Sequence, residues 1–208
     1  MNEQRAWQVL LIGGASGVGK TSMSYRLAHR DGIGITEIDD FQVVLEGMTR
    51  PEDQPVLHFW RAHPDEWQRL DDEQRLAFAI RYARVMAKAL ELMIANHLES
   101  RTPIVLEGDF LLPSLAVQRT DAGIPATQQV RAVFLYEDEE QIRLNYLARE
   151  GEQQPERARA SWCYSEWLRQ EAERLGVPTI PARPWETVLE RANTAVHLPG
   201  APERPGRV

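Results

Sequence analysis

The chain has 208 residues, a formal net charge of −7 at pH 7 and a single cysteine, Cys163. This length suits one domain with a full hydrophobic core, and the acidic balance argues against DNA or RNA as the main partner. One cysteine excludes an intramolecular disulfide, no apolar run approaches the roughly 18 residues of a membrane span, and the first residues do not resemble a signal peptide. We therefore expect a cytoplasmic protein that binds neither membrane nor nucleic acid.

The first predicted strand, residues 9–12, leads directly into the stretch LIGGASGVGKTS. Gly14, Gly19, Lys20 and Thr21 fit the pattern G-x-x-x-x-G-K-S/T, and a helical pattern follows them. In such a loop, backbone N–H groups surround phosphate oxygens, the lysine reaches the β- and γ-phosphates, and the hydroxyl can ligate Mg²⁺. The predicted ATP-binding residues are Gly14, Ala15, Ser16, Gly17, Val18, Gly19, Lys20, Thr21 and Ser22. A glycine-rich turn without function is disfavoured, because five constraints are met together.

Four further strands are predicted in chain order, in GIGITEIDD, TPIVLEGDF, QVRAVFLYEDEE and GVPTIPA. Their alternation with helices predicts a three-layer α/β sandwich with a five-stranded parallel sheet. The second strand is expected to end at the paired Asp39 and Asp40, and the third at Glu107. Because the carboxyl ends of parallel strands share one edge, these carboxylates are expected beside the glycine-rich loop.

Between the second and third strands, residues 41–100 are too many for a simple crossover and predict a helical insert that binds the acceptor. The segment 49–67 reads as irregular, whereas 71–100 reads as one long helix with an aspartate cap. The apolar stripe predicted for this helix consists of Leu76, Ile80, Ala83, Ala87, Leu90, Ile94 and Leu98. The candidate acceptor-binding residues are Asp40, Arg61, Arg81 and Arg84. Leu57, Phe59 and the tryptophans of the insert could equally hold an apolar or aromatic acceptor.

After the fourth strand, a helix breaks into a polar segment around Gly151 and Pro155. A further helix is predicted over residues 157–175 and a last one over 185–195. The Pro/Gly-rich tail, 198–208, is expected to be flexible, which leaves residues 1–197 as a single domain.

The stretches GGASGVGKTS, IDDF and VLEGDFLLP together resemble P-loop small-molecule kinases. The resemblance extends to uridine kinase, phosphoribulokinase and pantothenate kinase, is greatest for the 2-phosphoglycerate kinase-like group, and covers about half the chain. It implies ATP-dependent transfer of the γ-phosphate to a hydroxyl or phosphate group of a small molecule. Two alternatives stay open: a nucleoside or nucleoside-monophosphate kinase, and an ATP-binding regulatory protein that hydrolyses ATP slowly.

The resemblance also implies roles for individual residues. Asp39 matches the general base that follows the second strand, and Glu107 matches the glutamate that assists Mg²⁺ together with Thr21. Asp40 could instead cap a helix that starts at Phe41, and Glu107 could simply end a strand.

In this family a mobile lid covers the transferring phosphate, and the corresponding segment here is 149–160. Its candidate arginines are Arg143, Arg149, Arg157 and Arg159. The catalytic residues that we select are Asp39, Lys20 and one of these arginines, Arg149. Arg149 is chosen because it lies at the helix break, where its guanidinium group can stabilise phosphate charge. The resemblance further places residues 181–185 near the nucleotide base.

Overall fold

The computed structural model of the chain describes residues 7–117 and 129–197. Its centre is a five-stranded parallel sheet in the order β2-β3-β1-β4-β5. The strands are β1 (Val9–Gly13), β2 (Gly34–Glu37), β3 (Ile104–Gly108), β4 (Val130–Tyr136) and β5 (Thr179–Pro181). Every residue of β1 and β3 is buried, as expected for strands covered on both faces. The predicted α/β fold with a five-stranded parallel sheet is confirmed.

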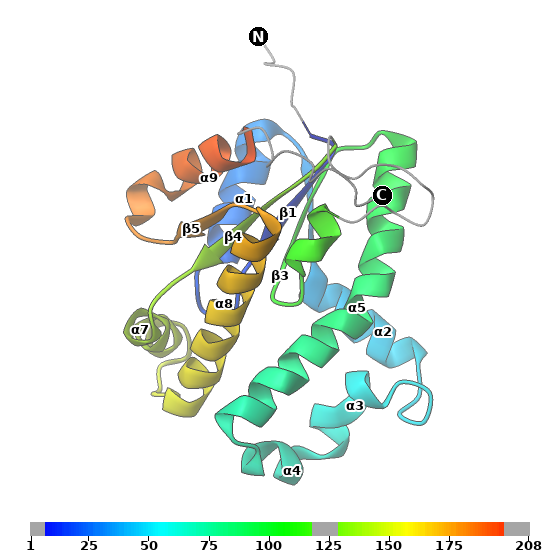
Figure 1. Cartoon of the computed structure of the whole chain (residues 1–208), viewed down its shortest axis with the longest axis vertical. Helices are drawn as coiled ribbons and strands as arrows, with labels where there is room; N and C mark the ends of the chain where they lie inside the picture. Colours follow the sequence, from blue (N-terminus) through cyan, green and yellow to red (C-terminus); the bar gives the residue numbers. More distant parts are fainter. Residues whose placement is uncertain (1–6, 118–128, 198–208) are drawn as a thin grey trace, which may run out of the picture.

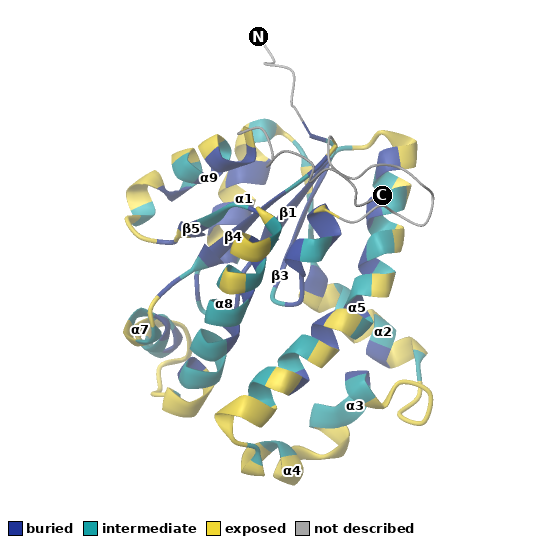
Figure 2. Cartoon of the chain, in the orientation of Figure 1, coloured by how far each residue is buried: buried dark blue, intermediate teal, exposed yellow. Residues whose placement is uncertain are grey.

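Helices cover both faces of this sheet (Figure 1). On one face, α1 (Lys20–Asp31) packs against α9 (Val188–His197); on the other, α5 (Asp72–Ser100) packs against α8 (Pro155–Leu175). The short helix η1 (Pro113–Ala116) also packs against α8. The sheet therefore lies between two layers of helices, as predicted. The buried residues, dark blue in Figure 2, are concentrated in the strands and on the helix faces turned toward them.

The segment between β2 and β3 is helical throughout most of its length. It forms α2 (Ile38–Met48), α3 (Pro55–Ala62), α4 (Pro64–Arg69) and then α5. The stretch 49–67 that reads as irregular thus contains two short helices, each with a proline at its first position, where the missing N–H costs nothing. Asp71 caps α5 through a reciprocal pair with Gln74, which confirms the predicted aspartate cap.

The buried face of α5 is wider than the predicted stripe. Ala83, Leu90, Ile94 and Leu98 are buried, but Leu76, Ile80 and Ala87 are only partly buried. The remaining buried side chains are Phe78, Tyr82 and Met86. In the first half of α5, Phe78 and Tyr82 are buried because α3 packs on them beyond the edge of the sheet.

Two predicted boundaries near the site are wrong. The second strand ends at Glu37, so Asp39 and Asp40 lie in the first turn of α2. Asp40 does not cap a helix at Phe41, because that helix already begins at Ile38. Ile38 is buried, and a Cβ at Gly108 would come within 2.6 Å of it, so its packing against the end of β3 starts the helix early.

The segment 149–160 is not a long loop. It comprises the end of α7 (Glu139–Glu150), a short connection and the first turns of α8, which starts at Pro155 rather than at residue 157. The predicted last helix begins at Val188, after the single turn η2 (Trp185–Thr187). The predicted flexible tail, 198–208, lies outside the described residues. Within the described ranges, no helix has the length and apolar character needed to cross a membrane.

Candidate active site

The loop between β1 and α1 has a backbone shape that depends on glycine. Gly14, Gly17 and Gly19 have φ values of 145°, 85° and 93°, in the left-handed half of φ space that residues with a Cβ rarely adopt. A Cβ at Gly14 would come within 2.5 Å of the carbonyl oxygen of Leu135. Glycine is therefore required at these positions by the backbone conformation and by close packing against neighbouring residues. A glycine-rich loop of this kind can turn its N–H groups toward phosphate oxygens.

This loop forms one wall of a cavity of about 640 Å³ at the carboxyl ends of the strands. The lining residues are Ser16, Gly17, Val18, Gly19, Lys20, Thr21, Ser22, Asp39, Asp109, Glu137, Asn145, Ala148, Arg149, Ala182, Arg183 and Trp185. The structure thus brings Asp39 and Arg149 into the same cavity as the P-loop, as expected. Asp40, Arg61, Arg81 and Arg84 do not line it.

Lys20 is buried at the start of α1, and its ammonium group contacts the carboxylate of Asp109. Burial alone would lower the pKa of Lys20, but the charges of Asp109 and Glu107 outweigh it and raise that pKa. Lys20 is therefore a permanent cation held at the floor of the cavity. Asp109 is thus a further residue of the site, two positions after Glu107.

Glu107 lies on β3 near Thr21 in the first turn of α1, and the Thr21 hydroxyl acts to lower the pKa of its carboxyl group. Glu107 is 2% exposed, and its Oε2 has no hydrogen-bond partner among the described residues. Burial raises the pKa of Glu107 to about 7. A buried carboxylate with a free oxygen, next to the loop hydroxyl, fits the oxygen donors that Mg²⁺ prefers. These two residues could hold the metal, with nucleotide phosphate and water completing its shell.

Asp39 faces the cavity from the first turn of α2. It remains accessible to water, yet the surrounding protein removes enough solvent to raise its pKa to about 6, and the charge of Asp109 adds to the effect. The positive charge of Lys20 acts to lower the pKa of Asp39. The packing of Ile38 against Gly108 fixes this turn at the end of β3, so Asp39 is positioned by the sheet and not by a loop.

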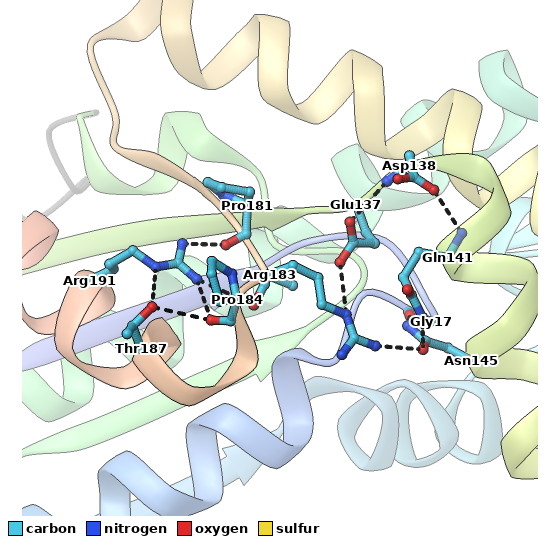
Figure 3. Close-up of polar contacts among 11 residues, drawn as sticks. Gly17, Glu137, Asp138, Gln141, Asn145, Pro181, Arg183, Pro184, Thr187 and Arg191 are labelled. Atoms are coloured by element: carbon cyan, nitrogen blue, oxygen red, sulfur yellow. Dashed lines mark hydrogen bonds and ion pairs between the residues drawn. The ribbon is translucent and has the colours of Figure 1, made fainter.

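On the opposite side, Ala182, Arg183 and Trp185 of the segment after β5 line the cavity. Figure 3 shows the polar contacts of this segment. Arg183 lies between Glu137 and Asn145, and Asn145 donates to the carbonyl oxygen of Gly17 at 2.7 Å. Arg191 holds this segment by donating to the carbonyl oxygens of Pro181 and Pro184 at 2.5 and 2.9 Å.

Two residues in this part of the site were missed from the sequence. Glu137 is the first residue after β4, so the same edge rule that selected Glu107 could have found it. Asn145 lies in the middle of α7 without a local signal. Ala182, Arg183 and Trp185 line the cavity. That residues 181–185 lie near the nucleotide base stays a prediction.

Of the four candidate lid arginines, Arg149 is the one that lines the cavity among the described residues. Its guanidinium group lies over the ring of Tyr146 and pairs with Glu150 at 2.6 Å. The other three are held by ion pairs outside the cavity: Arg143 with Glu140, Arg157 with Glu150, and Arg159 with Glu139 and Asp72.

The strand order, the glycine-rich loop before α1 and the carboxylates at the adjoining strand ends define the fold of P-loop small-molecule kinases. Solved structures share it. Shikimate kinase from Acinetobacter baumannii, in complex with shikimate, aligns with a TM-score of 0.51 and 18% identity over 92% of both chains. The tunicamycin resistance protein of Deinococcus radiodurans aligns with a TM-score of 0.50 and 18% identity, over 94% of this chain and 99% of that one.

A curated relative is similar in sequence as well. The 2-phosphoglycerate kinase of Methanococcus maripaludis strain C5 is 27% identical over 115 residues, which cover 51% of this chain and 37% of the relative. The matched region thus spans little more than a third of that relative's length. No family model matches the chain.

Proposed function

We propose that this chain is an ATP-dependent phosphotransferase that moves the γ-phosphate of ATP to a hydroxyl group of a small molecule. The observation that carries the proposal is the placement of Asp39 in the same cavity as the P-loop. Phosphoryl transfer needs a gripped triphosphate and a carboxylate that orients the attacking hydroxyl, and the cavity has both. The kinase fold and the similarity to 2-phosphoglycerate kinase support the same class.

Each residue has one task in this proposal. The loop N–H groups and Lys20 hold the phosphates, and Thr21 with Glu107 would hold Mg²⁺, which neutralises phosphate charge when bound. Asp39 accepts the proton of the acceptor hydroxyl. At the same time the oxygen of that hydroxyl bonds to the γ-phosphorus, and the bond from the γ-phosphorus to the leaving ADP oxygen breaks. Arg149 stabilises the charge on the transferring phosphate.

The candidate functions that remain differ in the molecule that accepts the phosphate. The relative's name suggests 2-phosphoglycerate, and a nucleoside or nucleoside monophosphate is the alternative within the kinase class. A regulatory protein that hydrolyses ATP slowly is the alternative outside it. Because the reaction draws on cellular ATP, we place the protein in the cytoplasm.

A screen with γ-labelled ATP and Mg²⁺ tests the proposal. The protein is incubated with sugars, organic acids, nucleosides and aminoglycosides, and transfer of label is followed together with ADP formation. A kinase shows label on one acceptor and faster ADP formation in its presence. Slow hydrolysis that no acceptor accelerates would contradict the proposal and favour the regulatory protein.

A further inference from the structure

One side chain of α7 holds the backbone of the glycine-rich loop. The Nδ2 group of Asn145 donates a hydrogen bond of 2.7 Å to the carbonyl oxygen of Gly17, although the two residues are 128 positions apart. A Cβ at Gly17 would lie 3.1 Å from Ile142 and 3.4 Å from Tyr146, so α7 packs directly against this part of the loop. Asn145 thus joins the loop that borders the cavity to the helix that carries Arg149.

This contact fixes the direction of one peptide group of the loop. Gly17 has a φ of 85°, and glycine permits backbone rotations that other residues resist. The C=O of Gly17 and the N–H of Val18 belong to the same trans peptide group, so they point in opposite directions. A donor on the carbonyl oxygen therefore also keeps the Val18 N–H pointing away from Asn145. A loop that binds phosphate through its N–H groups depends on the direction of each of them.

The side-chain amide of Asn145 is itself held in the orientation that this bond needs. Its Oδ1 accepts a hydrogen bond of 2.9 Å from Nε2 of Gln141, one turn earlier on α7, and a longer one of 3.4 Å from Nη2 of Arg183 (Figure 3). Because donors face Oδ1, the Nδ2 group is the one that faces the Gly17 carbonyl. The loop, α7 and the segment after β5 therefore meet at one amide group.

Asn145 also lines the cavity, as do the two arginines beside it, Arg149 and Arg183. A direct contact with the nucleoside is therefore the alternative role for this side chain. Both polar atoms of the amide already have protein partners, however, which favours a role in holding the loop. Among the described residues, Gln141 is not one of those that line the cavity, so its side chain can affect a bound ligand only through its neighbours.

We propose that Asn145 is a positioning residue for triphosphate binding. It holds the Gly17 peptide group in the direction that turns the loop N–H groups toward phosphate oxygens, and Gln141 acts through it. This inference rests on the proposed function, because it takes the glycine-rich loop as the site of the triphosphate. It adds two side chains of α7 to the groups on which phosphate binding depends.

Asn145→Ala tests the role with two probes, each added with Mg²⁺. One is ATP, and the other is inorganic tripolyphosphate, which has the phosphates but no nucleoside. We expect calorimetry to show that the Kd of both rises about fivefold, because one hydrogen bond that holds the loop is lost. A rise for ATP alone would show that Asn145 contacts the nucleoside and would overturn the inference. Wild-type Kd values for both probes would overturn it as well, and so would a wild-type protein that binds ATP but not tripolyphosphate.

Gln141→Ala gives a second test that leaves every group in the cavity in place. We expect it to raise the Kd of both probes about twofold, because the Asn145 amide is then held less firmly. In the Asn145→Ala background the same change should have no further effect, since the two side chains act as one unit. An equal effect in both backgrounds would overturn the action of Gln141 through Asn145.

Leu144→Ala is the matched control on the same helix, because Leu144 is 42% exposed and lies outside the residues that line the cavity. It should leave both Kd values unchanged, and thermal unfolding confirms that each variant is folded. An equal rise in Leu144→Ala and Asn145→Ala would show a general effect of α7 and overturn the positioning role. A wild-type protein that binds neither probe would contradict the proposed function itself, whereas wild-type affinity in Asn145→Ala overturns only this inference.

Discussion

The buried ammonium group of Lys20 contacts the carboxylate of Asp109, which joins the P-loop to the segment that follows β3. The side chains of Lys20 and Asp109 are 7% and 20% exposed. We propose that a bound triphosphate takes the place of Asp109 at this ammonium group. Nucleotide binding would then exchange one anion for another at a buried cation.

This exchange predicts the behaviour of Asp109→Asn. Removing the charge deprives the buried Lys20 of the carboxylate that it contacts and leaves Glu107 as the nearest strong counter-charge, so the free energy of unfolding without nucleotide should fall by about 3 kcal/mol. Saturating ATP and Mg²⁺ should remove most of this deficit, because phosphate then neutralises Lys20. Denaturant unfolding with and without nucleotide measures both values, with the exposed Asp40→Asn as control. An equal deficit in both conditions would show that Asp109 is needed for a different reason.

Ionisation of the buried Glu107 carboxyl group should lower the free energy of unfolding at high pH. Its pKa is about 7 in the folded protein against an ordinary value of 4.5, because burial disfavours the charged form. The folded state therefore binds more protons than the unfolded state, and stability is lost as pH rises from about 4.5 through 7. Without Mg²⁺, Glu107→Gln should be more stable than the wild type by about 1–3 kcal/mol at pH 8 and similar to it near pH 4. Urea unfolding at the two pH values checks this, and a Glu107→Gln protein that is less stable at pH 8 would refute it.

Arg149 should act on the transferring phosphate. Because it is the candidate lid arginine that lines the cavity in the described part of the chain, Arg149→Ala should lower kcat by about 10²-fold with little change in stability. Arg143→Ala, on the same helix but paired with Glu140 outside the cavity, serves as the control. Steady-state kinetics with a saturating acceptor separate the two. Equal losses in both variants would argue for a general effect of positive charge on α7.

Trp185 should support the nucleotide from the side opposite Asp39. A Cβ at Gly19 would come within 3.0 Å of the Trp185 ring, so the ring lies directly against the loop, and it also lines the cavity. Trp185→Leu should raise the Kd of ATP about tenfold through lost ring contact. Trp162→Leu on α8 is the matched control, and isothermal titration calorimetry gives both constants. An unchanged Kd in Trp185→Leu would exclude a nucleotide contact.

The sequence was sufficient for those features whose signal is local. The loop around Lys20 is defined by consecutive residues, and the apolar runs of β1 and β3 stand out because both faces of the sheet are covered. The rule that parallel strands end at one edge then placed Glu107 beside Thr21 without a structure.

Features that arise from distant contacts were not predictable. Asp39 was expected at a strand end, but the burial of Ile38 against Gly108 starts a helix there, and this contact joins residues 70 positions apart. The roles of Asp109 and Asn145 depend on Lys20 and Gly17, which are 89 and 128 positions away. No local pattern records such pairs, because each side chain by itself fits an exposed polar position.

The central claim is that Asp39 receives the proton of an acceptor hydroxyl in front of a bound triphosphate. The direct measurement compares Asp39→Asn with Asp40→Asn, using acceptor-dependent ADP formation for turnover and calorimetry for ATP binding. We predict that Asp39→Asn lowers kcat by roughly 10² to 10⁴ while the Kd of ATP stays near the wild-type value, and that wild-type kcat/KM declines below about pH 6 as Asp39 becomes protonated. Wild-type turnover in Asp39→Asn, with the loss found in Asp40→Asn instead, would contradict the account.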